Sequence, residues 1–239
     1  MTTFLLFGGA SGSGGAVCRR LLDAGEDVVM VDGGEAAASL ASDYEGRDFA
    51  GTLLQLHAPP DDADACEEAL HICSKRFGAP DCVFVNLNRA ESRPLEEWSA
   101  KAFDAELAFS LKAPFLIVQA AAARMAKAGK GGSIVLTSSS AALRGRSGKA
   151  PFHAAKAGLV GLCRSLAQEL ASRRIRVNCI LPGWIDTVYG RTGAPIDTIP
   201  LRRLGHVDEV AEAVIYLMSA RSANLNGTAL IVDGGATAV

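Results

Sequence analysis

The sequence predicts one doubly wound α/β domain over residues 1–239, built on a parallel sheet of seven strands. Seven short apolar runs alternate with longer segments of helical periodicity along the chain. Most of these runs are apolar at successive positions, as strands are when helices cover both faces of a parallel sheet. The connections between the segments are short, which indicates right-handed crossovers within one sheet.

The expected strands are Phe4–Phe7, Val28–Val31, Thr52–Leu56, Cys82–Val85, Ile134–Thr137, Ile175–Ile180 and Ala229–Val232. The expected helices lie between them, at Gly14–Ala24, Asp62–Phe77, Leu95–Lys127, Pro151–Ser172 and Val207–Ala220. The last segment repeats apolar residues at a helical period. A chain of 239 residues with 49% apolar residues is long enough to bury a single core.

Composition and charge exclude several classes of function. The net charge of -2 and the pI of about 6.1 give no basic surface for nucleic acid. No apolar run reaches the roughly 18 residues that a membrane span needs. The N-terminus enters an apolar run without a basic leader or a cleavage site, so it is interpreted as a strand rather than a signal peptide. We expect a cytoplasmic protein.

The cysteine spacing argues against a metal site and against a disulfide framework. None of the six cysteines forms a Cys-x-x-Cys pair, and no histidine lies at ligand spacing from them. We therefore expect no metal site, and small buried thiols in a reducing compartment.

The strongest local motif is a glycine-rich turn between the first strand and the first helix. Gly8, Gly12 and Gly14 allow a tight turn, a close approach of a pyrophosphate to the backbone, and packing of the helix on its strand. The free N–H groups at the helix N-terminus then face the phosphate. The pattern predicts a Rossmann-like dinucleotide site. A tight turn without a ligand is the alternative.

The second strand ends at Asp32, about 20 residues after the turn. A carboxylate at this position accepts hydrogen bonds from the adenosine ribose and repels a 2'-phosphate, so Asp32 favours NAD over NADP. The alternative is that Asp32 only forms a turn before Gly33.

At this point the chain resembles the short-chain dehydrogenase/reductase family, over nearly its whole length. The glycine turn matches the family's Gly-x-x-x-Gly-x-Gly pattern, with Phe7 where a threonine is usual. Further matches are the serine-rich end of the fifth strand at Ile134–Ser140, the helix Lys156–Leu170, Arg176–Asn178 with Pro182-Gly183, and Gly227 with Val232–Gly235.

The resemblance implies four catalytic positions, of which two have changed in this chain. Ser139 matches the serine that polarises the substrate oxygen, and Lys156 matches the lysine that lowers the pKa of a catalytic tyrosine and holds the nicotinamide ribose. The tyrosine position, one helical turn before that lysine, is Phe152, whose ring carries no exchangeable proton. The asparagine position of the proton relay is Ser110.

The resemblance also implies cofactor contacts. Asn86 is kept after the fourth strand, and Thr187 is expected to contact the cofactor after the sixth. Arg89 replaces a glycine beside the nicotinamide, where we expect its long side chain to crowd the cleft. His57 stands where an aspartate often meets the adenine. Two interpretations of Lys156 remain open: it holds the nicotinamide ribose, or it has a structural role only.

Several residues have two interpretations. His153 and Tyr189 are candidates to replace the missing phenol. The simpler interpretations are that His153, next to Phe152, points to another side of the helix, and that Tyr189 is part of the hydrophobic lining of its loop. Arg144, Arg146 and Lys149 suit an anionic substrate such as the phosphate of an acyl-CoA, or form a solvated loop.

Two functional hypotheses follow. In the first, the chain is a degenerate subunit that pairs with an active homologue through the two long helices, in an NAD-dependent complex acting on a hydroxyacyl-CoA. In the second, it is an active but atypical NAD-dependent ketoreductase or alcohol dehydrogenase, in which substrate or solvent supplies the proton. A homo-oligomer is the alternative assembly, and no nucleic acid or membrane partner is expected.

Overall fold

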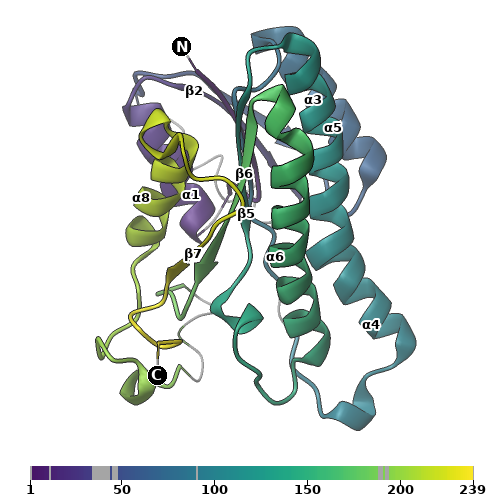
Figure 1. The fold of residues 1–239 in the computed structure, drawn as a ribbon, viewed down its shortest axis with the longest axis vertical. Coiled ribbons are helices and arrows are strands. Elements are labelled where there is room, and N and C mark those ends of the chain that lie inside the picture. The colour runs from purple at the N-terminus through teal and green to yellow at the C-terminus, as the bar shows by residue number, and fades with distance from the viewer. Residues whose placement is uncertain are drawn as a thin grey trace.

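A computed structural model describes residues 2–10, 12–33, 44, 48–89, 91–187, 191 and 194–238. It confirms the predicted fold: a seven-stranded parallel sheet in the order β3-β2-β1-β4-β5-β6-β7, flanked by helices (Figure 1). The strands are β1 (Thr3–Phe7), β2 (Asp27–Asp32), β3 (Leu53–His57), β4 (Cys82–Val85), β5 (Gly132–Thr137), β6 (Ile175–Pro182) and β7 (Ala229–Val232).

The helices form a layer on each side of the sheet (Figure 1). One layer contains α1 (Gly12–Asp23) and α8 (Val207–Met218). The other contains α3 (Ala63–Phe77), α4 (Ala100–Leu107), α5 (Ala113–Ala128) and α6 (Ala150–Leu170). Short 3-10 turns lie at Leu95–Glu97, Ser140–Ala142, Ala171–Arg173, Ile196–Thr198 and Ala220–Ser222.

The strand pattern explains why the sheet is covered on both faces. Every residue of β1 and of β4 is buried, so successive side chains enter the two helical layers alternately. The outer strands β3 and β7 are only half-buried, as strands at the edges of a sheet are. The six cysteines are all free and buried, which confirms their interpretation as core thiols. Burial raises the pKa of Cys18 and of Cys73 to about 11, so both thiols stay protonated at neutral pH.

The long helix expected over Leu95–Lys127 is interrupted in the structure. After the 3-10 turn at Leu95–Glu97, α4 runs into a π-helical turn at Ala108–Lys112 and then into α5. By length and composition the stretch Ala100–Ala128 would suffice to cross a membrane. Its buried residues, among them Ile117 and Ala121, pack into the core beneath the sheet, so it is a core helix here.

The sheet order places a crevice at the carboxyl ends of the central strands. The chain moves outward from β1 to β2 and β3, then returns to the other side of β1 at β4. The connections after β1 and β4 therefore separate in opposite directions, which leaves the space where ligands bind in open α/β sheets. The turns that follow β1, β2, β4, β5 and β6 all meet at this end.

Candidate functional site

A cavity of about 1220 Å³ opens at the carboxyl ends of the strands. The predicted site residues that line it are Gly8, Gly12, Asp32, Asn86, Ser139, Phe152 and Thr187. Residues from β1, β2, β4, β5, β6 and α6 thus meet in one space, although they are far apart in the sequence. The cavity has a glycine-turn end, near Gly8 and Asp32, and a catalytic end, near Ser139 and Phe152.

The glycine turn is as tight as the sequence predicted. Gly8 has φ +74° and Gly12 has φ +54°, backbone conformations that favour glycine. A Cβ on Gly8 would lie 2.3 Å from the Asn86 carbonyl oxygen, and one on Gly14 would lie 2.1 Å from the Gly8 carbonyl oxygen. This backbone cradle, followed by the N-terminus of α1, has the shape and polarity that a pyrophosphate requires.

Asp32 is bound to the glycine turn by its own carboxylate. One oxygen accepts a hydrogen bond from the Ala10 N–H at 2.9 Å, and the other accepts from the Gly33 N–H at 2.9 Å. Burial raises the pKa of Asp32, while these two N–H groups act in the opposite direction. The carboxylate therefore both fixes the turn and faces the end of the cavity where an adenosine ribose would lie.

Asn86 and Thr187 close the glycine turn from two sides. The Asn86 amide donates to the Gly8 carbonyl at 3.0 Å, and its backbone N–H donates to Phe7 at 2.8 Å. The Thr187 methyl group lies 3.4 Å from the place where a Cβ on Gly12 would be. Both residues line the cavity, and their contact with a cofactor stays a prediction. The Asn86 amide also holds the shape of the turn.

At the catalytic end, Ser139 and Phe152 share the cavity wall. The Ser139 hydroxyl oxygen accepts from the Ala141 N–H at 3.1 Å, so its own hydrogen remains available for a ligand. Phe152 is 7% exposed, and its ring centroid lies 5.6 Å from the Lys156 ammonium. No hydroxyl group stands at this position of α6 to exchange a proton.

Lys156, which the resemblance implies as a ribose ligand, is not among the residues that line the cavity. Its ammonium is fully buried and donates to the Leu87 carbonyl at 2.7 Å and to the Thr137 carbonyl at 3.1 Å. These bonds join the segments that follow β4 and end β5. Burial lowers the pKa of Lys156 to about 8, against the opposing charge of Glu106. These bonds give Lys156 a structural role, and its role as a ribose ligand stays a prediction.

Ser110 is likewise buried, and its hydroxyl bonds to a carboxylate on the same helical stretch. Its hydroxyl lies in the π-helical turn and donates to the Glu106 carboxylate at 2.5 Å. Glu106 is only 2% exposed, and neither residue lines the cavity. The sequence analysis missed Glu106; the signal that could have found it is an acid four residues before Ser110, on the same face of a helix that is otherwise apolar there.

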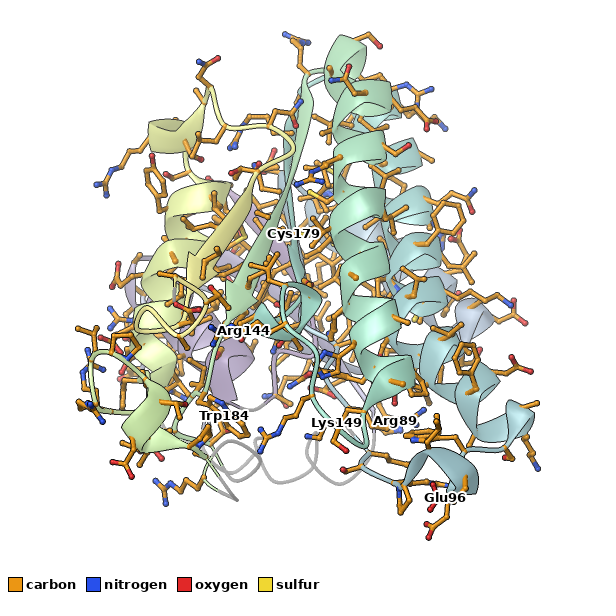
Figure 2. All side chains as sticks on the ribbon, turned by 60° about the horizontal axis from the view of Figure 1, so that its bottom comes forward. Arg89, Glu96, Arg144, Lys149, Cys179 and Trp184 are labelled. Carbon is orange, nitrogen blue, oxygen red and sulfur yellow. The ribbon has the colours of Figure 1, made fainter. Side chains whose placement is uncertain are left out.

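The expectation that Arg89 crowds the cleft is wrong. Its guanidinium stacks on the Phe109 ring at 4.5 Å from the centroid and donates to the Ala105 carbonyl at 3.1 Å. These contacts hold the side chain against α4 and the π-helical turn, and Figure 2 shows Arg89 beside the start of α6, apart from Trp184. His57 is exposed at the end of β3, opposite Asp32 in the strand register.

Of the two candidates to replace the phenol, His153 lines the cavity. Its Nδ1 lies 2.8 Å from the Ala141 carbonyl oxygen, and a carbonyl only accepts, so this nitrogen carries the proton. In the neutral ring, Nε2 is then the nitrogen that can accept a proton. Tyr189 lies outside the described residues.

The comparisons with known proteins agree on one family. The family described as Enoyl-(Acyl carrier protein) reductase matches residues 8–237. D-threitol dehydrogenase from Mycolicibacterium smegmatis is 34% identical, over 98% of this chain and 92% of its own length. The 3-oxoacyl-(acyl-carrier-protein) reductase FabG of Escherichia coli is 31% identical, over 97% of this chain and 95% of its own.

Solved structures give the same result. The levodione reductase structure has a TM-score of 0.88 and 28% identity, covering 100% of this chain and 98% of that one. A short-chain type dehydrogenase/reductase from Mycobacterium marinum has a TM-score of 0.91 and 26% identity, covering 100% and 96%. The chain therefore belongs to the short-chain dehydrogenase/reductase family of NAD(P)-dependent oxidoreductases.

Proposed function

We propose that this chain is a catalytically degenerate subunit of an NAD-dependent short-chain dehydrogenase complex. It would act in the cytoplasm, with an active homologous subunit, on a hydroxyacyl-CoA type of alcohol or ketone. The observation that carries the proposal is Phe152, which fills the position one helical turn before Lys156 where the family resemblance implies a phenol. Without that phenol, the wall of the cavity lacks the group that exchanges the alcohol proton.

The glycine-turn end supports retained binding of a dinucleotide. Gly8 and Gly14 leave a cradle that a Cβ would fill, and Arg89 is not among the residues that line the cavity. A bound nicotinamide cofactor would supply hydride acceptance, and the chain's own residues would hold its pyrophosphate and ribose. Because the Asp32 carboxylate faces this end, a 2'-phosphate would meet a negative charge. We expect titration calorimetry to show tighter binding of NAD than of NADP; tighter NADP binding would refute the cofactor choice.

An exposed groove supports assembly with a homologous subunit. It lies between the α4–α5 stretch and α6 and has a volume of about 730 Å³. Its lining is mainly apolar or small: Leu107, Ala108, Leu111, Phe115, Gly158, Gly161 and Leu162, with Asp104, Lys112 and Ser165 at its edges. These are the two long helices through which family members commonly pair. A Cβ on Gly161 would meet nothing within 4 Å, so a partner helix can approach α6 closely there.

The test compares turnover of a hydroxyacyl-CoA with NAD by three samples. They are this chain alone, the chain coexpressed with a homologue that keeps the tyrosine, and the same pair with that tyrosine replaced by phenylalanine. General acid/base catalysis contributes about 10² to 10⁴-fold, so we expect the chain alone and the third sample to be nearly inactive. Robust turnover by the chain alone would end the degenerate-subunit proposal.

The assembly is tested with a matched pair of variants on α6. Gly161→Glu places a charged side chain in the open groove, and we expect it to reduce recovery of the mixed oligomer on size exclusion. Arg164→Glu, on an exposed residue of the same helix that does not line the groove, is the control. Equal loss in both variants, or none in either, would contradict this choice of interface. A homo-oligomer through the same groove is the alternative that mass measurement of the chain alone would reveal.

The second candidate is an active, atypical NAD-dependent reductase, and one observation favours it. The Ala141 carbonyl fixes the His153 tautomer, which is how a general base is oriented in other enzymes. If the chain alone turns over substrate, His153→Gln should lower that turnover by about 10² or more. An unchanged rate in His153→Gln would leave substrate or solvent as the proton source.

A further inference from the structure

A buried acid and a buried base occupy the layer formed by α4 and α6 (Figure 1). Glu106 of α4 is only 2% exposed, and Lys156 of α6 is fully buried. Neither side chain is among those that line the cavity or the groove. In the described part of the chain, these two are the charged side chains that are buried. A buried charge is unfavourable unless it is paired or hydrogen-bonded, so their opposite charges indicate a compensating pair.

The two helices approach each other closely beside this pair. A Cβ on Gly158, two residues after Lys156, would lie 3.0 Å from Leu111 Cδ2. Leu111 belongs to the π-helical turn that continues α4, directly after Ser110. Because Gly158 has no side chain, the segment that carries Glu106 can pack close to α6.

The Glu106 carboxylate is oriented by its own helical stretch. It accepts a hydrogen bond from the Ser110 hydroxyl at 2.5 Å, within a stretch whose other buried side chains are apolar. One neutral donor offsets only part of the loss of hydration that a carboxylate suffers on burial. The remaining negative charge is compensated by the positive charge on α6.

Lys156 has hydrogen-bonding capacity left over. Its ammonium carries three N–H groups and donates to the Leu87 carbonyl at 2.7 Å and to the Thr137 carbonyl at 3.1 Å. The described residues offer no acceptor to the third N–H. The Thr137 hydroxyl, which lines the cavity, is buried and likewise without a partner among the described residues. This wall of the cavity therefore keeps polar groups for a ligand.

The groups that face Lys156 differ in their effect on its charge. Burial lowers the pKa of Lys156 to about 8, and the charge of Glu106 is the first of those that oppose this effect. Cys179 of β6 is the second, but its hydrogen bond with Cys163 and its burial hold the pKa of that thiol well above its usual range. The thiol is therefore neutral at pH 7. The Phe152 ring, at 5.6 Å from the ammonium, carries no charge.

We propose that Glu106 is a positioning residue for Lys156: its buried carboxylate keeps the ammonium charged and bonded to the carbonyls of Leu87 and Thr137, at the wall of the cofactor cavity. This inference rests on the proposed function, in which the cavity retains a dinucleotide. A neutral amine has one N–H fewer and presents a lone pair instead, so it could not serve two carbonyls and a ligand hydroxyl together. Glu106 thus acts on the cofactor only through the lysine.

The first experiment follows the charge of Lys156 directly, in the full chain labelled with ¹³C-lysine. The ¹³Cε signal of Lys156 titrates with pH and is assigned by its loss in Lys156→Met. Glu106→Gln keeps the shape of the side chain and an acceptor for Ser110, and we expect it to lower the titration midpoint by about one pH unit or more. Glu169→Gln removes the same charge from an exposed position of α6 and should shift the midpoint by less than about 0.3 pH unit.

Two further variants separate charge from packing. Glu106→Asp keeps the charge, so its midpoint should lie closer to that of the unmodified chain than the midpoint of Glu106→Gln does. An unchanged midpoint in Glu106→Gln, or equal shifts in both variants, would overturn the proposal. If Glu106→Gln does not fold, Glu106→Gln/Lys156→Met should fold, because it leaves no unpaired buried charge. Failure of this double variant to fold would assign Glu106 to packing alone and also overturn the proposal.

The second experiment connects the lysine to the cofactor. NADH affinity, measured by calorimetry, should weaken as pH rises through the Lys156 midpoint, and in Glu106→Gln this weakening should begin about one pH unit lower. The same pH profile in both proteins would overturn the role of Glu106 toward the cofactor. If the unmodified chain binds no NADH at any pH, the proposed function fails, whereas the lysine titration still tests Glu106.

Discussion

The two ends of the cavity differ in what their geometry depends on. At the glycine-turn end, the shape comes from backbone conformation and from the close approach of Gly8, Gly14 and Asn86. At the catalytic end, it comes from individual side chains such as Ser139 and Phe152, and Phe152 differs from what the family resemblance implies. The phenyl ring is accommodated beside Lys156 without any disturbance of α6.

Under the proposed function, this difference explains how catalysis can be lost while cofactor binding is kept. A dinucleotide cradle is built into the fold, because the same glycines that make the turn also allow α1 to pack on β1. A general acid is a single functional group, and replacing it by an apolar ring of similar shape leaves the packing intact. A chain can therefore retain its fold and cofactor site after its own chemistry has gone.

The largest effect is expected from a substitution that disrupts the glycine turn. Gly14→Ala places a Cβ 2.1 Å from the Gly8 carbonyl oxygen, so the backbone of the turn must move. We expect NAD affinity to fall by about 100-fold or more in calorimetry, with a loss of about 1–3 kcal/mol in unfolding free energy. Gly161→Ala, where a Cβ meets nothing within 4 Å, is the control. If both variants bind NAD equally, the cradle is not where the dinucleotide lies.

The next prediction tests Lys156 as a buried structural cation. Burial lowers its pKa from 10.5 to about 8, so between these values the unfolded chain binds more protons than the folded chain. The contribution of this group to the unfolding free energy should therefore rise with pH across this window, by up to about 1.4 kcal/mol per pH unit. The buried thiols of Cys18 and Cys73, whose pKa is raised, contribute in the opposite direction above about pH 9, so the Lys156 contribution is read as a difference between variants. Lys156→Met should remove this slope in urea unfolding, whereas the exposed Lys127→Met should keep it. An unchanged slope in Lys156→Met would contradict the assignment.

A third prediction tests the two changed catalytic positions, Phe152 and Ser110. Phe152→Tyr alone should give little recovery of turnover, because Ser110 remains bonded to Glu106 and supplies no relay toward Lys156. Phe152→Tyr/Ser110→Asn should exceed the single variant by about ten-fold or more in an assay of NAD reduction. A fully active single variant would show that Ser110 does not limit the site.

The smallest expected effect concerns Arg89. Its side chain is held by Phe109 and the Ala105 carbonyl, and it is not among the residues that line the cavity. Arg89→Ala should change NAD affinity less than about two-fold, since an exposed arginine contact of this kind contributes little. An increase of ten-fold in NAD affinity would revive the crowding that the sequence suggested.

The sequence by itself determined the sheet, the glycine turn and the absence of a phenol one turn before Lys156. These features depend on local periodicity and on residue identity: apolar runs of strand length, glycines at a strand–helix turn, and a spacing of four along a helix. They need no knowledge of which distant side chains meet. The π-helical turn within the predicted long helix left no such local signal.

Only the tertiary structure decided the directions of the long side chains. Arg89 has many rotamers, and the Phe109 ring that holds it lies 20 residues away in the chain. The burial of Lys156 depends on carbonyls that follow β4 and end β5, and Arg146 meets Trp184 across the cavity. Long charged side chains take the conformation in which distant partners offset the loss of hydration and rotamer entropy, so residue type alone does not fix where their charges lie.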